Sequence, residues 1–175
     1  MSASVFAASS LNVTIANTIS LDIIPRTAAG TFAHSSTSDN TVSVSTNNYT
    51  GYTLGIAAST ANDNALSYKE NNTIVDSINS HNVSAGVSET NYANDSYASS
   101  NNLNNTWGYR PSKYNSEDNT TTNLYYPAPT STSTTILDTT SVANPTTSNN
   151  YNIAIGARVG LDKTPGAYTN TFVIT

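Results

Sequence analysis

Residues 11–23 read LNVTIANTISLDI, and this stretch decides the fold class of the chain. Its apolar residues fall on alternate positions, namely Leu11, Val13, Ile15, Ile19, Leu21 and Ile23. Because successive side chains of a strand point to opposite faces, this period of two predicts one long strand with a buried face and a wet face. Asn17 interrupts the apolar face and predicts a kink or bulge, and Pro25 ends the strand.

The same alternation recurs along the chain. Residues 42–45 (VSVS) alternate, turn residues follow at 46–51, and the alternation resumes in phase at 52–56, so this pair predicts a hairpin. Residues 151–159 (YNIAIGARV) alternate cleanly near the other end of the chain. Shorter strands are predicted at 73–78 and at 83–87.

A turn is predicted after the strand at 151–159. Pro165 and Gly166 occupy the central positions of residues 164–167 (TPGA), which is the arrangement of a type II turn. Tyr168, Phe172 and Ile174 then form the returning strand.

The strand pattern predicts the fold class and the domain organisation. No segment longer than about ten residues shows the helical period of 3.6. We therefore expect an all-β chain, with an immunoglobulin-like antiparallel β-sandwich and long loops rich in Asn, Ser, Thr and Tyr. A single domain is expected over residues 11–175, with a long insertion around 88–135. The tail at 1–10 (MSASVFAASS) is interpreted as the remnant of an export signal, as an ordinary chain terminus, or as the lead of a donated strand.

The composition excludes several classes of protein. Of the 175 residues, 25 are Asn, 25 are Ser and 28 are Thr, whereas only 10% are charged, against about 25% in an ordinary soluble domain. The net charge of −5 and the lack of a basic run argue against a nucleic-acid surface. The chain has no Cys, which excludes disulfides and thiolate metal sites. No apolar run is long enough to span a membrane.

The insertion is rich in aromatic residues and poor in aliphatic ones. We expect short strands around Trp107 and Tyr125, with the Trp107 ring in the core. Tyr92, Tyr97 and Tyr114 lie in the most polar context and are predicted to be exposed. Tyr combined with Ser and Asn is the composition of recognition loops, so these three residues are candidate ligand-binding residues.

No candidate catalytic or metal-ligating set emerges. The chain lacks the motifs of hydrolases, metalloproteases, phosphate-binding loops and dinucleotide-binding folds, and we expect no enzyme activity. Acidic clusters such as residues 62–64 lack the spacing of a calcium loop, and His34 and His81 have no second ligand at metal spacing. No cofactor or metal is expected. Seven Asn-x-Ser/Thr triplets occur, which is the number that the composition alone predicts.

Several stretches resemble a known class of surface protein. Residues 29–32 (AGTF), 42–48 (VSVSTNN), 51–54 (GYTL), 107–109 (WGY) and 165–171 (PGAYTNT) resemble the modules of large secreted surface proteins of Saccharibacteria-type bacteria. The closing segment is also similar to the last strand of fimbrial and spore-coat-U-type subunits. The resemblance implies an exported, extracellular β-sandwich at the cell surface, in a fibre, stalk or adhesin, and implies no catalytic residue.

Two hypotheses about function follow. In the first, the chain is a structural subunit of a surface fibre or pilus, and residues 11–23, through Leu11, Val13, Ile15, Ile19, Leu21 and Ile23, complete the sheet of a neighbouring copy. Its partners would be other copies of itself or neighbouring surface modules. In the second, a self-contained adhesin module binds glycan or protein on a host cell through its Tyr-rich loops.

Overall fold

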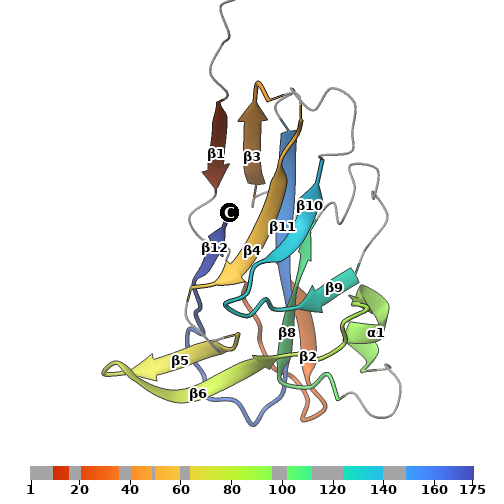
Figure 1. Ribbon diagram of the computed structural model, residues 1–175. Helices are drawn as coiled ribbons and strands as arrows, with labels where there is room; N and C mark the ends of the chain where they lie inside the picture. Colours follow the sequence, from red (N-terminus) through yellow and green to blue (C-terminus); the bar gives the residue numbers. More distant parts are fainter. Residues whose placement is uncertain are drawn as a thin grey trace, which may run out of the picture.

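The computed structural model describes residues 10–15, 21–35, 41–48, 50–59, 64–95, 102–111, 124–139 and 149–175 (Figure 1). Almost all of its regular structure is β. The elements are β1 (Leu11–Ile15), β2 (Thr31–His34), β3 (Thr41–Thr46), β4 (Thr53–Ala58), β5 (Leu66–Glu70), β6 (Thr73–Ser80), β7 (Val87–Ser88), α1 (Glu89–Asn94), β8 (Thr106–Pro111), β9 (Leu124–Pro127), β10 (Thr134–Asp138), β11 (Asn149–Val159) and β12 (Phe172–Ile174).

The larger of the two sheets is built around β11. On one side of β11 its first half pairs with β3 and its second half with β2, and on the other side it pairs with β8. β1 continues the sheet beyond β3, while β9 and β6 flank β8 and β5 follows β6. These pairings are antiparallel, except for the short parallel contact of β6 with β8.

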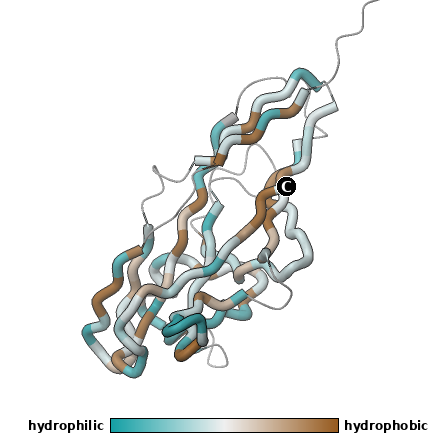
Figure 2. Tube along the Cα trace, turned by 90° about the vertical axis from the view of Figure 1, so that its left-hand side faces the viewer, coloured by the Kyte–Doolittle hydropathy of each residue, from teal (hydrophilic) through white to brown (hydrophobic). Residues whose placement is uncertain are grey.

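The smaller sheet has the order β10-β4-β12 and packs on the larger one. One buried cluster joins them, because it contains Val42 and Val44 of β3 together with Leu54 and Ile56 of β4. Figure 2 shows the underlying pattern, since hydrophobic and hydrophilic residues alternate along the strands. The chain is therefore an all-β protein with antiparallel sheets, consistent with a sandwich. Its immunoglobulin-like character stays a prediction.

The predicted hairpin at 42–56 is wrong, although both of its strands exist. β3 lies in the larger sheet and β4 in the smaller one, so the connection crosses between sheets. β3 buries Val42, Val44 and Thr46 on one parity, whereas β4 is buried throughout from Leu54 to Ala58, and the buried side of β3 faces β4 across the core. Gly51 permits the crossing, because its φ is +82° and a Cβ there would lie 2.6 Å from the Thr139 carbonyl oxygen.

The N-terminal strand is shorter than predicted. β1 ends at Ile15, residues 21–26 form no strand, and the kink expected at Asn17 lies outside the described residues. Leu21 and Ile23 instead pack beside Trp107 in a second buried cluster.

Two further expectations need correction. Residues 81–86 form no strand, and only Val87 and Ser88 pair, with β9. Gly166 does not adopt the positive φ that a type II turn requires, and β12 pairs with β4 of the smaller sheet rather than returning along β11. The connection has to reach the other sheet, which a tight turn would prevent.

The insertion contains the predicted strands and one short helix. β8 and β9 lie where they were expected, and Trp107 is 2% exposed, so its placement in the core is confirmed. Helix α1 was not predicted, because six residues are too few to show a helical period. Its N-cap is Ser88, whose hydroxyl accepts a hydrogen bond from the Asn91 N–H at 3.2 Å. Asp95 ends it in the left-handed conformation.

Candidate functional site: an apolar groove between the sheets

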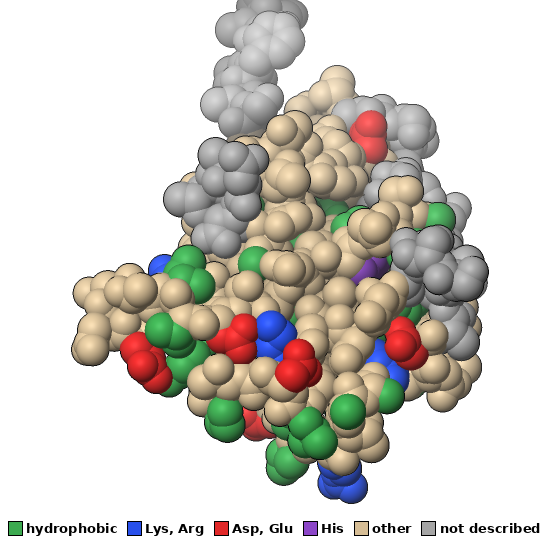
Figure 3. All heavy atoms as spheres, turned by 90° about the horizontal axis from the view of Figure 1, so that it is seen from below, with side chains coloured by type: hydrophobic (Ala, Val, Ile, Leu, Met, Phe, Trp, Pro, Cys, Tyr) green, Lys and Arg blue, Asp and Glu red, His purple; other side chains and the backbone are tan. Residues whose placement is uncertain are grey.

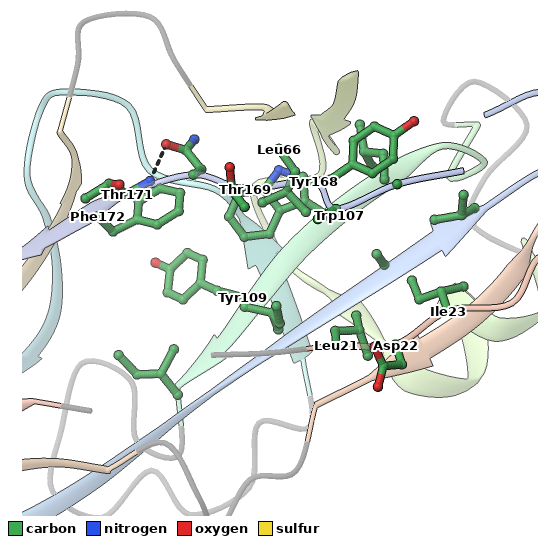
Figure 4. Close-up of a pocket in the computed structure, with 18 of the residues that line it drawn as sticks. Leu21, Asp22, Ile23, Leu66, Trp107, Tyr109, Tyr168, Thr169, Thr171 and Phe172 are labelled. Carbon is green, nitrogen blue, oxygen red and sulfur yellow. Dashed lines mark hydrogen bonds between the residues drawn. The ribbon is translucent and has the colours of Figure 1, made fainter. Parts of the chain in front are cut away.

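A groove of about 990 Å³ opens between the two sheets. Its size lies at the upper end of the range for ligand pockets. Figure 4 shows Tyr168, Thr169 and Phe172 along one side and Leu21 and Ile23 along the opposite side. The apolar side chains that line it come from most parts of the fold and include Ile56, Leu66, Ile78, Trp107, Tyr109, Ile153, Ile155, Val159, Phe172 and Ile174.

One wall of the groove belongs to each sheet. Ile153 and Ile155 project from β11 of the larger sheet, and Ile56 projects from β4 of the smaller one. Trp107 ties the walls together, since its ring lies 5.4 Å from that of Phe172 on β12 and its indole N–H donates to the Asn64 carbonyl at 2.9 Å. The groove thus continues the hydrophobic core between the two sheets and is open to solvent.

Residues 163–171, which we call the strap, line the groove between β11 and β12. Asp76 of β6 holds the first part of the strap: it accepts hydrogen bonds from Lys163 Nζ at 2.8 Å, the Thr164 N–H at 2.9 Å and the Tyr168 hydroxyl at 2.7 Å. Thr169 holds the second part by exchanging two backbone hydrogen bonds with Ser67 of β5, each 3.0 Å long.

The charges around Asp76 are consistent with an ionised carboxylate. Partial burial alone would raise the pKa of Asp76, but the hydrogen bonds from Lys163, Thr164, Tyr168 and Ser77 outweigh it and hold the pKa well below its usual range. Burial, together with the hydrogen bond to Asp76, raises the pKa of Tyr168. The strap is therefore anchored by an ion pair and a neutral phenol.

The predicted strand-exchange residues split between two places. Leu11, Val13 and Ile15 lie on β1, whereas Leu21 and Ile23 line the groove. Ile19 lies outside the described residues.

The apolar face of β1 is not covered. Val13 pairs with Val44 and Ile15 with Val42, so the odd residues of β1 face the side on which the smaller sheet packs. They nevertheless remain exposed, at 57% for Leu11, 42% for Val13 and 43% for Ile15. The side chain of Ile15 reaches the groove, and Leu11 lines a hollow of about 100 Å³ with Tyr52.

The smaller sheet stops short of covering β1. β12 and the adjoining Thr175 pair with β4 only from Gly55 to Ala58. In the described part of the chain, no strand pairs with Thr53 and Leu54 of β4 on the side that β12 occupies. A further strand at this position would continue the smaller sheet toward the apolar face of β1, whereas the groove is lined by Ile56 of β4, which β12 already pairs.

The predicted exposure of Tyr92 is wrong. Tyr92, a residue of α1, is fully buried, and its hydroxyl lies 2.9 Å from Thr106 Oγ1. Burial raises its pKa. A ring in this position cannot stack on a ligand at the surface. Tyr97 and Tyr114 lie outside the described residues, and binding through the Tyr-rich loops stays a prediction.

Tyr92 belongs to a buried aromatic cluster that the sequence analysis did not find. Its ring makes edge contacts with Tyr125, at 5.8 Å, and with His81, at 5.6 Å. Burial lowers the pKa of His81 to about 4, against a smaller opposite effect of the backbone groups of Tyr125 and Tyr126. His81 is therefore neutral at pH 7. The only sequence signal for this cluster was the density of aromatic residues.

A buried cation supports the same region. Arg158 of β11 is 5% exposed, and its guanidinium donates to the carbonyl oxygens of Ala29, at 2.7 Å and 3.0 Å, and of Tyr92 and Ala93. Tyr92 and Ala93 lie in α1, so the cation stabilises the C-terminal half of this helix. No carboxylate in the described residues forms an ion pair with it.

The described residues show no site of another kind. No group of three or more His, Cys, Asp or Glu side chains within them could hold a metal ion. His34 lies on the surface, 3.4 Å from Glu89, and His81 lies in the aromatic cluster. Within the same residues no helix is both long and apolar enough to cross a membrane.

Comparisons with known proteins identify no relative. No family model matches the chain. No match is found among curated proteins, and none among solved structures.

Proposed function

We propose that this protein is a non-catalytic, extracellular structural subunit of a bacterial surface fibre or pilus, and that it assembles by strand addition. The observations that carry the proposal are the open apolar groove, which Ile15 of β1 and Ile56 of β4 line, and beside it the exposed apolar residues of β1 and the end of β4 that no described strand pairs on the side of β12.

The groove has the features of a site for an extended segment. Strand addition combines main-chain hydrogen bonds at a sheet edge with pockets for alternate side chains. Thr53 and Leu54 of β4 supply the edge, and the apolar side chains between the sheets supply the pockets. A strand placed there would bury Leu11, Val13 and Ile15, and each such burial stabilises the assembly by about 1.5–3 kcal/mol when it is complete.

The occupant we propose is residues 11–23 of a neighbouring copy. Their alternate apolar residues match the requirement for one buried face. Only Leu11–Ile15 of this segment are paired in the described structure, to the single strand β3, and all five are exposed. A strand that pairs along one edge only and is buried on neither face loses the fewest contacts when it detaches. β1 is such a strand, so moving it to a neighbouring copy costs little free energy.

The surface chemistry agrees with an extracellular role. Figure 3 shows one face of the molecule, on which acidic, basic and hydrophobic side chains lie scattered among backbone atoms and other polar side chains. A surface of hydroxyl and amide groups suits strands and turns.

The test uses the only Trp of the chain as a reporter of the groove. A synthetic peptide of residues 11–23 is titrated into the full chain while Trp107 fluorescence is recorded, because Trp107 lines the groove. The control peptide carries Asp at positions 13 and 15. We expect saturable binding of the first peptide and none of the second.

Assembly is measured on the same samples by light scattering and electron microscopy. Filaments that shorten or disappear when the peptide of residues 11–23 is added would support the proposal. A strictly monomeric chain that ignores the peptide at all concentrations would contradict it.

A further inference from the structure

The edge strands of the described structure differ in how well they are protected. Natural proteins protect sheet edges with charges, bulges, prolines or short strands. β5 carries Lys69, Glu70 and a bulge, β10 carries Asp138 and a bulge, and β12 spans only three residues. β1 has none of these devices: its five residues LNVTI are uncharged and pair with β3 without a bulge.

The free backbone groups of β1 belong to its apolar residues. The Asn47 N–H donates to the Ser10 carbonyl at 3.3 Å, so Ser10 faces β3. Hydrogen-bonded and non-hydrogen-bonded pairs alternate in an antiparallel ladder, so Asn12 and Thr14 also bond to β3. The N–H and C=O groups of Leu11, Val13 and Ile15 therefore point away from β3, toward the open edge.

This edge is complementary to itself. In an antiparallel pair with a two-fold axis at Val13, Val13 lies opposite Val13 of the second copy and Leu11 lies opposite Ile15. Each outward-facing residue then exchanges both of its hydrogen bonds with the residue opposite. Leu11, Val13 and Ile15 of both copies lie on the same face of the joined sheet. Their exposed side chains therefore form one continuous apolar surface across the two copies.

We propose that the unassembled chain forms a two-fold dimer through the free edge of β1. The dimer joins the larger sheets of two copies into one continuous sheet, and its contact is isologous. If the proposed strand addition holds, the dimer has a second consequence, which rests on that function. Pairing at this edge keeps β1 on its own β3 and therefore competes with the donation of residues 11–23.

The test exploits the absence of Cys from the chain. In the two-fold dimer, Val13→Cys places the two sulfurs on directly opposed residues, within disulfide reach. Asn12→Cys is the matched control: it also lies on β1, but opposite Thr14, so the two introduced sulfurs are diagonal neighbours. Under mild oxidation we expect V13C to cross-link at least about tenfold faster than N12C, because diagonal positions lie beyond disulfide distance.

Light scattering completes the test on chains without Cys. The unassembled fraction of the unmodified chain is expected to be a dimer, that of Val13→Asp a monomer, and that of Val173→Asp, at another exposed apolar position, still a dimer. Equal cross-linking of V13C and N12C, or a monomer for the unmodified chain, would overturn the inference.

The two proposals fail separately. Filaments from a chain whose V13C and N12C variants cross-link equally would leave strand addition intact and remove the dimer. A dimer that cross-links through V13C but never forms filaments, even after reduction of the disulfide, would leave the dimer intact and remove strand addition. If both hold, oxidised V13C does not assemble until it is reduced.

Discussion

Gly156 of β11 lies directly opposite Gly108 of β8, and the two glycines together make room for two buried rings. A Cβ on Gly156 would lie 2.5 Å from Cε1 of Tyr125, and a Cβ on Gly108 would lie 2.7 Å from Nε2 of His81. The pair therefore acts as the floor of the aromatic cluster, on the face of the larger sheet that α1 covers.

Adding one methyl group to this floor is expected to destabilise the fold. Gly108→Ala would also place its Cβ 2.6 Å from the Tyr126 carbonyl oxygen, a backbone atom that cannot move aside. We expect a loss of about 1–3 kcal/mol for G108A and for G156A, measured by urea unfolding. Gly160→Ala is the milder control, since its closest neighbour is a side-chain atom, Oδ1 of Asp162, and the nearest backbone atom, the Ala28 carbonyl oxygen, lies 3.1 Å away. Equal losses at the three positions would contradict this interpretation.

The stability of the fold is expected to depend on pH through His81. The pKa of His81 is about 4 in the folded chain, against its usual 6.5, so the unfolded chain binds a proton between these values and the folded chain does not. The free energy of unfolding therefore falls as the pH is lowered from about 6.5 to about 4, by about 3 kcal/mol from this group.

Two variants test whether His81 causes this dependence of the unfolding free energy on pH. His81→Gln should flatten the dependence of the unfolding free energy on pH in this window, measured in urea at several pH values. His34→Gln should retain the slope, because His81 is still present. A slope unchanged in H81Q would show that another group is responsible.

Asp76 is expected to stabilise the strap. Asp76→Asn removes the ion pair with Lys163 and weakens the acceptor of the Thr164 and Tyr168 hydrogen bonds. We expect a loss of about 1–3 kcal/mol at pH 7, since these bonds are charge-assisted. The pKa of Asp76 is lowered in the fold, so its contribution is present above the usual pKa of 3.8 and is lost as the pH falls below it. The difference between the unmodified chain and D76N should therefore shrink in acid.

The two buried tyrosines of the aromatic cluster should respond differently to loss of the hydroxyl. Tyr92→Phe removes the hydrogen bond to Thr106 and should cost about 1 kcal/mol. The Tyr125 hydroxyl is buried and has no hydrogen-bond partner in the described residues, so Tyr125→Phe should be neutral or stabilising. Thermal unfolding of the two variants measures this, and a larger loss for Y125F than for Y92F would contradict it.

The strands were predictable from the sequence to the extent that they bury one face. β11, with Tyr151, Ile153 and Val159 on one parity, lies where the alternation indicated, and so does the short β8 around Trp107. Alternation says which face is buried but not which strand lies alongside. The sequences of β3 and β4 would show the same alternation in a hairpin and in two strands that face each other across a core. The alternation therefore cannot distinguish a hairpin from the crossing that the structure shows.

The candidate site was predictable only in part. Leu21 and Ile23 were recognised as apolar strand positions, and they do line the groove, but from a segment without a strand. The groove itself lies between two sheets whose packing no local pattern encodes. The aromatic cluster around Tyr92 needs the glycines at 108 and 156, which make room for the rings of His81 and Tyr125 and which are distant in the sequence and adjacent only across the sheet.

The buried Arg158 is bound by backbone carbonyl oxygens and not by a side chain in the described residues, and this limits which second substitutions could compensate for its loss. Its guanidinium is satisfied by the carbonyl oxygens of Ala29, Tyr92 and Ala93, which any amino acid at those positions would supply. Substitutions at Ala29 and Ala93 can therefore leave the hydrogen bonds of the guanidinium intact, provided that the backbone keeps its path, whereas Tyr92 is constrained separately by its place in the aromatic cluster. Conversely, Arg158 has no acidic partner in the described part of the chain whose removal would restore the balance of charge. A charge change at another described residue is therefore not expected to restore the stability lost with Arg158. We expect Arg158 to be replaceable only if the backbone around residues 29, 92 and 93 also changes its path.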